Sequence, residues 1–171
     1  MKLLSDASEY GLRAVVWLAQ RPGQAQKVRE IAQGTQAAPG YLVKVLQALA
    51  KAHILSAQRG SHGGFRLERD PFELSVLEVV NAIDPIQRIH ACPLGFQAHR
   101  QCLCPTHRRI DDAMATIEQS FGEATIADLV TEPARPGQVC TRLVASHATP
   151  AAPATAGAPA TPGTPDTRAN E

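Results

Sequence analysis

Apolar residues recur at helical spacing through the first 51 residues of the chain and predict three helices. The first is expected over about Ser5–Arg21 and is ended by Pro22. A shorter second helix closes near Gly34, and the residues it turns inward are Val28, Ile31 and Ala32. The third begins at Pro39, because a proline's missing N–H would have no partner in the first turn of a helix anyway.

The third helix is the most clearly amphipathic of the three. Its apolar stripe consists of Leu42, Val45, Leu46 and Leu49. The opposite face carries Tyr41, Lys44, Gln47 and Lys51. A second and third helix joined by a turn after Gly34 indicate either a helix-turn-helix or an ordinary three-helix bundle.

Two strand-like runs follow the helices and decide between these alternatives. Residues 54–59 and 64–68 are separated by the glycine-rich sequence Gly60-Ser-His-Gly-Gly, which is typical of a hairpin tip. A helix-turn-helix followed by a basic hairpin is a winged helix. We therefore expect a mostly α fold with a small β hairpin.

The pattern continues with a helix from about Ser75 to Ile83, capped by Ser75, and an irregular stretch over residues 88–106. A further amphipathic helix begins near His107, and its apolar positions are Ile110, Ala113, Met114, Ile117 and Phe121. Thr125–Val130 adds a last helical turn or two. An amphipathic helix outside a compact winged helix needs a partner surface, and a second copy of the chain is the simplest one.

Three segments follow from this pattern. Residues 1–84 form a predicted winged helix-turn-helix, and residues 85–132 hold the cysteine-bearing loop and a dimerisation helix. Residues 133–171 are rich in Ala, Pro and Thr with almost no large apolar residue, so this tail is expected to be disordered.

The charge is distributed unevenly along the chain. Residues 1–70 hold ten Lys and Arg against five Asp and Glu, whereas residues 71–132 hold four against nine. A basic first half fits a nucleic-acid-binding face, although solvated surfaces also carry such imbalances.

Composition and cysteine usage point to the cytoplasm. No apolar run approaches the roughly 20 residues that cross a bilayer, and no charged-then-apolar leader begins the chain, so we expect a soluble protein without membrane association. In a reducing cytosol, clustered cysteines are metal ligands or redox sensors more often than disulfides.

Three of the four cysteines lie close together in the irregular stretch. Cys92, Cys102 and Cys104 are followed by His107. Thiols and imidazoles at this density suit a soft metal centre. The residues alone leave open an iron–sulfur cluster, zinc or another metal, and a metal-free thiol switch.

Several of these features occur together in one family. They are Lys2-Leu3, Tyr10-Gly-Leu-Arg-Ala14, Tyr41-Leu42, the wing with Arg59-Gly60 and Gly63-Gly-Phe-Arg-Leu67, and Cys104-Pro-Thr-His107. Over residues 1–130 the chain resembles the bacterial winged-helix iron–sulfur transcription regulators that include IscR and NsrR. The resemblance implies a DNA-binding regulator, in expectation a repressor, and no enzyme.

The resemblance also implies a homodimer on a pseudo-palindromic double-stranded operator, with one 2Fe–2S or 4Fe–4S cluster per subunit. Cluster state would set DNA affinity in response to nitric oxide, redox state or cluster supply. In relatives the three cysteines are usually separated by five residues each. Cys92 and Cys104 keep the outer span, but Ala98 stands at the middle position and Cys102 is out of frame.

A ligand other than thiolate has two candidates. Glu9 aligns with a carboxylate of the first helix that ligates the cluster in some members. The spacing Asp6-Ala-Ser-Glu9 also fits a capping box, in which Glu9 would only satisfy the helix N-terminus. His107 matches the ligand histidine of the IscR-like branch, or serves as a group that hydrogen-bonds a ligand. The candidate metal ligands are therefore Cys92, Cys102, Cys104, Glu9 and His107.

The DNA contacts are expected on the third helix and the wing. Gly40, Tyr41 and Lys44 lie at the start of the helix, with Lys44 directed to phosphate. Arg59 is expected to enter a narrow minor groove, with His62 nearby at the hairpin tip. The alternative is a solvated basic hairpin.

Other functions remain open at this point. A regulator without a cluster would act as a thiol switch or dock a partner enzyme. An enzyme is disfavoured, because the chain has no nucleotide-binding glycine pattern, no acid–base pair near the thiols and no Cys-x-x-Cys motif.

Overall fold

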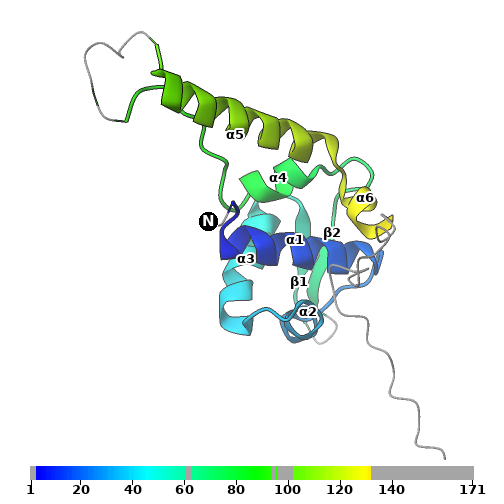
Figure 1. The fold of residues 1–171 in the computed structure, drawn as a ribbon. Coiled ribbons are helices and arrows are strands. Elements are labelled where there is room, and N and C mark those ends of the chain that lie inside the picture. Colours follow the sequence, from blue (N-terminus) through cyan, green and yellow to red (C-terminus); the bar gives the residue numbers. More distant parts are fainter. Residues whose placement is uncertain (1–2, 61–62, 94, 96–101, 132–171) are drawn as a thin grey trace, which may run out of the picture.

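The computed structural model describes residues 3–60, 63–93, 95 and 102–131 (Figure 1). In chain order, its elements are α1 (Asp6–Ala19), α2 (Val28–Thr35), α3 (Pro39–Lys51), β1 (Leu55–Gln58), β2 (Gly64–Leu67), α4 (Val76–Asn81), α5 (Pro105–Glu123) and α6 (Ile126–Thr131). Three helices followed by a hairpin are the predicted winged-helix arrangement. The predicted tail and His62 lie outside the described residues.

The start of α1 differs from the capping box expected from Asp6 and Glu9. Ser5 is the N-cap, and its hydroxyl accepts a hydrogen bond from the Ser8 N–H at 3.3 Å. The helix thus begins one residue earlier than that spacing assumed, because a serine hydroxyl was available as a cap. Glu9 is left one position beyond the box, where its carboxylate pairs with Arg13 at 3.5 Å.

The core surrounds α1, which packs on α2 and α3 and also on α4 and α6. All four residues of the predicted α3 stripe are buried, and all four on its opposite face are exposed. α1 and α2 pack closely where Gly34 meets Trp17, since a Cβ at position 34 would overlap the indole ring. This contact requires glycine inside a helix despite its low helix propensity.

The wing is a two-stranded antiparallel sheet in which Leu55 lies opposite Leu67. On the other side of β2, Gln26 and Phe65 exchange two backbone hydrogen bonds of 2.8 Å. The segment that leads into α2 therefore fixes the wing against the helices.

The last helices cover the other side of α1. Ser75 caps α4 and forms a capping box with Glu78. The Val76 N–H donates to Ala124 and the Ile126 N–H donates to Leu74, both at 2.9 Å, which joins the start of α4 to the start of α6. Ile126 is fully buried.

α5 stands apart from the compact part of the molecule (Figure 1). It begins at Pro105, two residues before the predicted start, because Cys104 is its N-cap and proline suits the first helical position. It packs on α4, and none of its residues is buried. None of the described helices is both long and apolar enough to cross a membrane.

Candidate cysteine site and nucleic-acid interface

The first turn of α5 holds two of the predicted ligands together. Cys104 is the N-cap residue, and its carbonyl accepts a hydrogen bond from the Arg108 N–H at 2.9 Å. His107 lies three residues further along the same turn. The separation of the Cys104 Sγ and His107 Nδ1 atoms is 3.2 Å, which is hydrogen-bond distance for a sulfur atom.

Cys92 reaches the same imidazole from a different part of the chain. Its Sγ atom lies 3.8 Å from His107 Nδ1, and both Cys92 and Cys104 are half-buried. We call Cys92, Cys104 and His107 the cysteine site. The structure thus brings together three of the five predicted metal ligands.

The other two predicted ligands are placed differently. Cys102 is exposed, and Glu9 pairs with Arg13 on α1. Within the described part of the chain, no group of three or more His, Cys, Asp or Glu side chains is placed to hold one metal ion. Two thiols and an imidazole nitrogen are nevertheless the soft donors that iron–sulfur clusters take in proteins.

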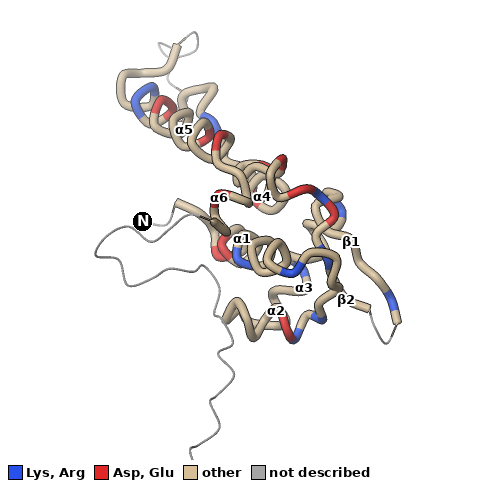
Figure 2. The backbone as a smooth tube through the Cα atoms, turned by 90° about the vertical axis from the view of Figure 1, so that its right-hand side faces the viewer, with Lys and Arg blue, Asp and Glu red and all other residues tan. Residues whose placement is uncertain are grey.

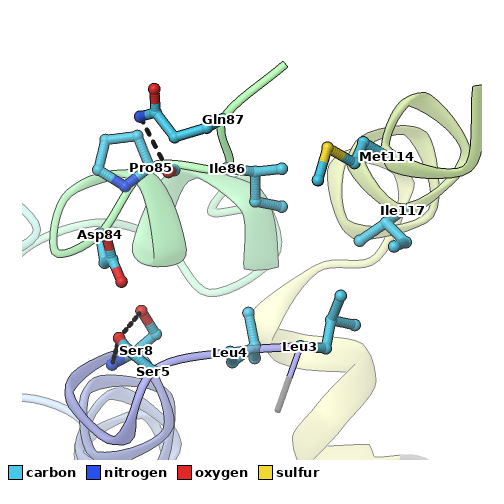
Figure 3. A pocket seen from close by; sticks show the side chains of 10 residues that line it. All are labelled: Leu3, Leu4, Ser5, Ser8, Asp84, Pro85, Ile86, Gln87, Met114 and Ile117. Atoms are coloured by element: carbon cyan, nitrogen blue, oxygen red, sulfur yellow. Dashed lines mark hydrogen bonds between the residues drawn. The ribbon is translucent and has the colours of Figure 1, made fainter. Parts of the chain in front are cut away.

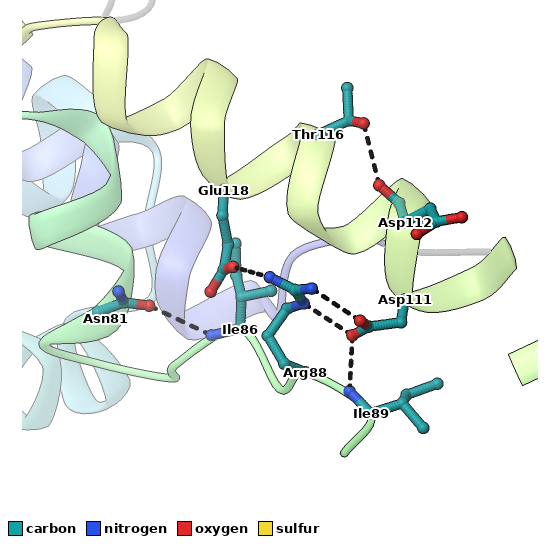
Figure 4. Close-up of polar contacts among 8 residues, drawn as sticks. All are labelled: Asn81, Ile86, Arg88, Ile89, Asp111, Asp112, Thr116 and Glu118. Carbon is teal, nitrogen blue, oxygen red and sulfur yellow. Dashed lines mark hydrogen bonds and ion pairs between the residues drawn. The ribbon is translucent and has the colours of Figure 1, made fainter. Parts of the chain in front are cut away.

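An ion-pair network ties the chain before Cys92 to α5 (Figure 4). Arg88 donates from Nε and Nη2 to the two carboxylate oxygens of Asp111, each at 2.7 Å, and from Nη1 to Glu118 at 3.0 Å. The Ile89 N–H donates to the same Asp111 carboxylate at 2.9 Å. We call Arg88, Asp111 and Glu118 the Arg88 network.

These contacts shift the ionisation of both partners. The hydrogen bonds from Arg88, followed by that from the Ile89 N–H, lower the pKa of Asp111 to about 2. The hydrogen bonds to Asp111 and then Glu118 raise the pKa of Arg88. The pair is therefore charged at any pH in which the protein operates.

Sequence reasoning missed the Arg88 network. Arg88 is one of only four Lys and Arg residues in the acidic segment 71–132, and Asp111 and Glu118 are seven residues apart, hence on one face of a helix. That combination is a usable signal for an intramolecular ion pair.

The start of α3 is open to solvent, as a nucleic-acid-binding helix requires. Tyr41 is 45% exposed, and its ring meets Tyr10 of α1 edge-to-face with centroids 5.9 Å apart. Lys44 is exposed one turn later. A Cβ at Gly40 would have no neighbour within 4 Å, so nothing in the fold requires glycine there.

The hairpin presents the other predicted DNA contacts. Arg59 is exposed at the end of β1, and Arg66 on β2 is exposed with its Nε donating to the Ser56 hydroxyl at 2.9 Å. Lysines and arginines lie along the hairpin and near α2, whereas α5 carries both signs of charge (Figure 2). Arg66 adds a second exposed guanidinium to the wing.

The fold is that of a winged-helix DNA-binding protein with an added helix. The Rrf2 family, described as iron-dependent transcriptional regulators, matches residues 4–132, and the chain belongs to this family. Its members are DNA-binding transcriptional regulators and not enzymes. The family resemblance predicted from the sequence is thereby confirmed.

Solved structures give the same fold. The chain is similar to CymR, the global cysteine regulator of B. subtilis, with 20% identity and a TM-score of 0.63 over 76% of this chain and 97% of that one. T. potens IscR is 24% identical, with a TM-score of 0.61 over 76% of this chain and 86% of that one. The oxidized form of Staphylococcus aureus CymR is 21% identical, with a TM-score of 0.61 over 79% of this chain and 100% of that one.

The lowered pKa of Asp111 predicts an acid dependence of stability. Its folded-state value of about 2 lies below the ordinary 3.8, so the stabilisation is complete above the ordinary value and is lost as pH falls toward 2. We expect the metal-free protein to melt at a higher temperature than its Asp111→Asn variant by a constant margin above about pH 5. That margin should shrink below about pH 4 in thermal unfolding monitored by circular dichroism. A margin that is unchanged or grows on acidification would contradict it.

Proposed function

We propose that this regulator is a repressor whose affinity for its operator is set by an iron–sulfur cluster bound at the cysteine site. The observation that carries the proposal is the convergence of Cys92 and Cys104 on one imidazole nitrogen, at 3.8 and 3.2 Å. These donors come from two segments 12 residues apart, and they meet at the start of the helix that projects from the winged helix.

Cys92 and Cys104 would each supply a thiolate to the cluster. Cys102, His107 and Glu9 are the candidates for the remaining positions, with Glu9 contributed by the first helix of a second subunit. When bound, the cluster supplies a centre that reacts with nitric oxide or oxygen or changes oxidation state. A ligand other than thiolate is the most readily displaced, so loss would begin there.

The apolar face of α5 supports a homodimer. Ile110 of α5 is 42% exposed, and Leu3 of the N-terminal segment is 63% exposed. Leu3 also lines a hollow of about 230 Å³, into which apolar side chains of the N-terminal segment, residues 84–87 and α5 point (Figure 3). They include Leu3, Leu4, Ile86, Met114 and Ile117. A second copy of the chain would cover this surface by two-fold symmetry.

A dimer joins the cysteine site to DNA. Residues 1–84 would hold the operator, and residues 85–132 would sense and dimerise. Two recognition helices in a dimer must be spaced by about one turn of DNA, so a small change in the position of α5 would alter operator affinity. The operator would be pseudo-palindromic, with α3 in the major groove and the hairpin beside the minor groove.

One observation favours a second candidate, a regulator that switches by thiol chemistry without a cluster. The cysteine site is grouped by contacts among its own side chains, and an imidazole beside a thiol is a common way of making that thiol reactive. Absence of iron and sulfide after anaerobic reconstitution would favour this candidate, or a regulator that docks a partner enzyme.

We expect protein purified without oxygen to contain iron and acid-labile sulfide in equal amounts and to absorb visible light. Cys92→Ser and Cys104→Ser should each remove the cluster, because a hydroxyl replaces a thiolate ligand. Cys140→Ser in the tail is the matched control and should retain it. Colourless wild-type protein, or full cluster content in both ligand variants, would refute the proposal.

We expect that Gly40 lacks a side chain because DNA approaches the helix there, since the fold itself leaves room for one. Gly40→Ala should raise the free energy of unfolding by up to about 1 kcal/mol through helix propensity. It should weaken binding to an operator selected from random duplexes, because the new methyl group faces the nucleic acid. Gly122→Ala is the control, since its Cβ would meet only Leu77 at 3.7 Å. If Gly40→Ala binds the operator as tightly as Gly122→Ala, Gly40 is not at the interface.

Arg59→Ala should weaken operator binding roughly tenfold, because an arginine inserted in a narrow minor groove loses a desolvated contact. Lys51→Ala removes an exposed charge at the other end of α3 and should cost less than about twofold. A fluorescence-anisotropy titration at fixed salt compares them. Equal small losses for the two variants would show that Arg59 does not contribute to the interface.

A further inference from the structure

The segment that carries Cys92 has neither helix nor strand, yet it is tied to its neighbours at successive points. Residues 84–93, which we call the connecting segment, follow α4 after Ala82 and Ile83. The Asn81 side chain at the end of α4 accepts a hydrogen bond from the Ile86 N–H at 3.2 Å. Three residues later the Ile89 N–H donates to Asp111 of α5 at 2.9 Å. The connecting segment therefore links the two helices (Figure 4).

Arg88 provides most of the polar contact between this segment and α5. Its guanidinium makes two hydrogen bonds of 2.7 Å to Asp111 and one of 3.0 Å to Glu118. The side chains of Arg88, Asp111 and Glu118 retain 30, 16 and 27% of their exposure, so the ions are only partly hydrated. A two-pronged contact of this kind fixes direction as well as distance.

The order of the contacts gives the direction of the connecting segment. Arg88 bonds Glu118 and Asp111, whereas Cys92, four residues later, contacts His107 nearer the start of α5. The connecting segment therefore runs antiparallel to α5. His107 and Asp111 are one helical turn apart, about 6 Å along the axis. Four residues of chain can reach no further than about 14 Å, so the position of Arg88 restricts where Cys92 can lie.

The two thiols of the cysteine site differ in what holds them. Cys104 is the N-cap of α5, and the helix itself fixes its backbone. Cys92 belongs to no helix or strand. Its place beside His107 is therefore left to other contacts, among them the Arg88 network and a hydrogen bond of 3.1 Å from the Gly95 N–H to the Cys92 carbonyl.

We propose that Arg88 is a positioning residue that holds Cys92 beside Cys104 and His107 before any metal binds. The inference rests on the proposed function in taking Cys92 as a metal ligand. Arg88 itself contacts no metal; it acts through the connecting segment. A site grouped in advance would take up a cluster faster and lose it more slowly, because less chain has to be ordered on binding.

The test measures the proximity of the two thiols in metal-free, full-length protein. Cys102→Ser and Cys140→Ser leave Cys92 and Cys104 as the only thiols. Dibromobimane becomes fluorescent when it bridges two neighbouring thiols, and its rate of bridging reports how often they meet. Arg88→Gln should slow bridging by roughly tenfold, because Cys92 is then held less closely beside Cys104.

Arg69→Gln is the matched control, since it removes the same charge from an exposed pair with Glu78. It should bridge at the parent rate. Asp111→Asn should slow bridging as Arg88→Gln does, and the double variant should be slowed by less than the two single effects combined, because both variants break the Arg88–Asp111 contact. Circular dichroism on each variant identifies any that has lost the helical fold.

Two results would overturn the inference: bridging by folded Arg88→Gln at the parent rate, or additive slowing in the double variant. The bridging needs no iron, so it is independent of the proposed function. Fast, Arg88-dependent bridging in a protein that never takes up iron would refute the cluster and leave the positioning role standing. If the protein binds a cluster but Arg88→Gln leaves the bridging rate unchanged, the proposed function stands and the positioning role of Arg88 is refuted.

Discussion

The carboxylate of Asp111 is the contact on which the arrangement of the cysteine site depends. It accepts two hydrogen bonds from Arg88 and one from the Ile89 N–H, and it lies one turn after His107 on α5. Without it, Arg88 would keep its hydrogen bond of 3.0 Å to Glu118, but its two bonds of 2.7 Å and the bond from the Ile89 N–H would be lost. A single residue of α5, Asp111, thus holds the connecting segment that leads from the winged helix to Cys92.

α5 combines features that a simple winged helix lacks. Its first turn carries Cys104 and His107, one face carries Asp111 and Glu118, and its apolar positions include Met114 and Ile117, which line the hollow next to α1. Because the helix is rigid, a change at its first turn moves its apolar face as well. We regard this sharing of one helix as the physical basis by which the proposed cluster would affect the geometry of the proposed dimer.

Much of the fold could be predicted from the sequence because its signals are local. The stripe of α3, Pro39 at its first position and Ser75 as the cap of α4 each act within one or two turns, and each prediction is confirmed. The capping box at Glu9 was wrong because two caps were available one residue apart, and spacing alone does not choose between Ser5 and Asp6.

The cysteine site could be predicted only in part. Cys104 and His107 are neighbours along the chain, so their contact follows from the helix start. That Cys92 meets the same nitrogen depends on Arg88 and Asp111, which are 23 residues apart in the sequence. Ion pairs between distant residues produce no periodic pattern in a sequence. The sequence therefore indicated the metal-ligating side chains but not the Arg88–Asp111 ion pair that we propose positions Cys92.

The central claim is that the state of the cysteine site controls binding to DNA, and the most direct measurement compares operator affinity for one preparation before and after cluster removal. Full-length protein would be titrated without oxygen against its selected operator, then again after the cluster is removed by nitric oxide and the iron is chelated. Our account predicts that affinity changes at least about tenfold between the two states, a coupling of the size that typically links two sites. Equal affinities in the two states would contradict it.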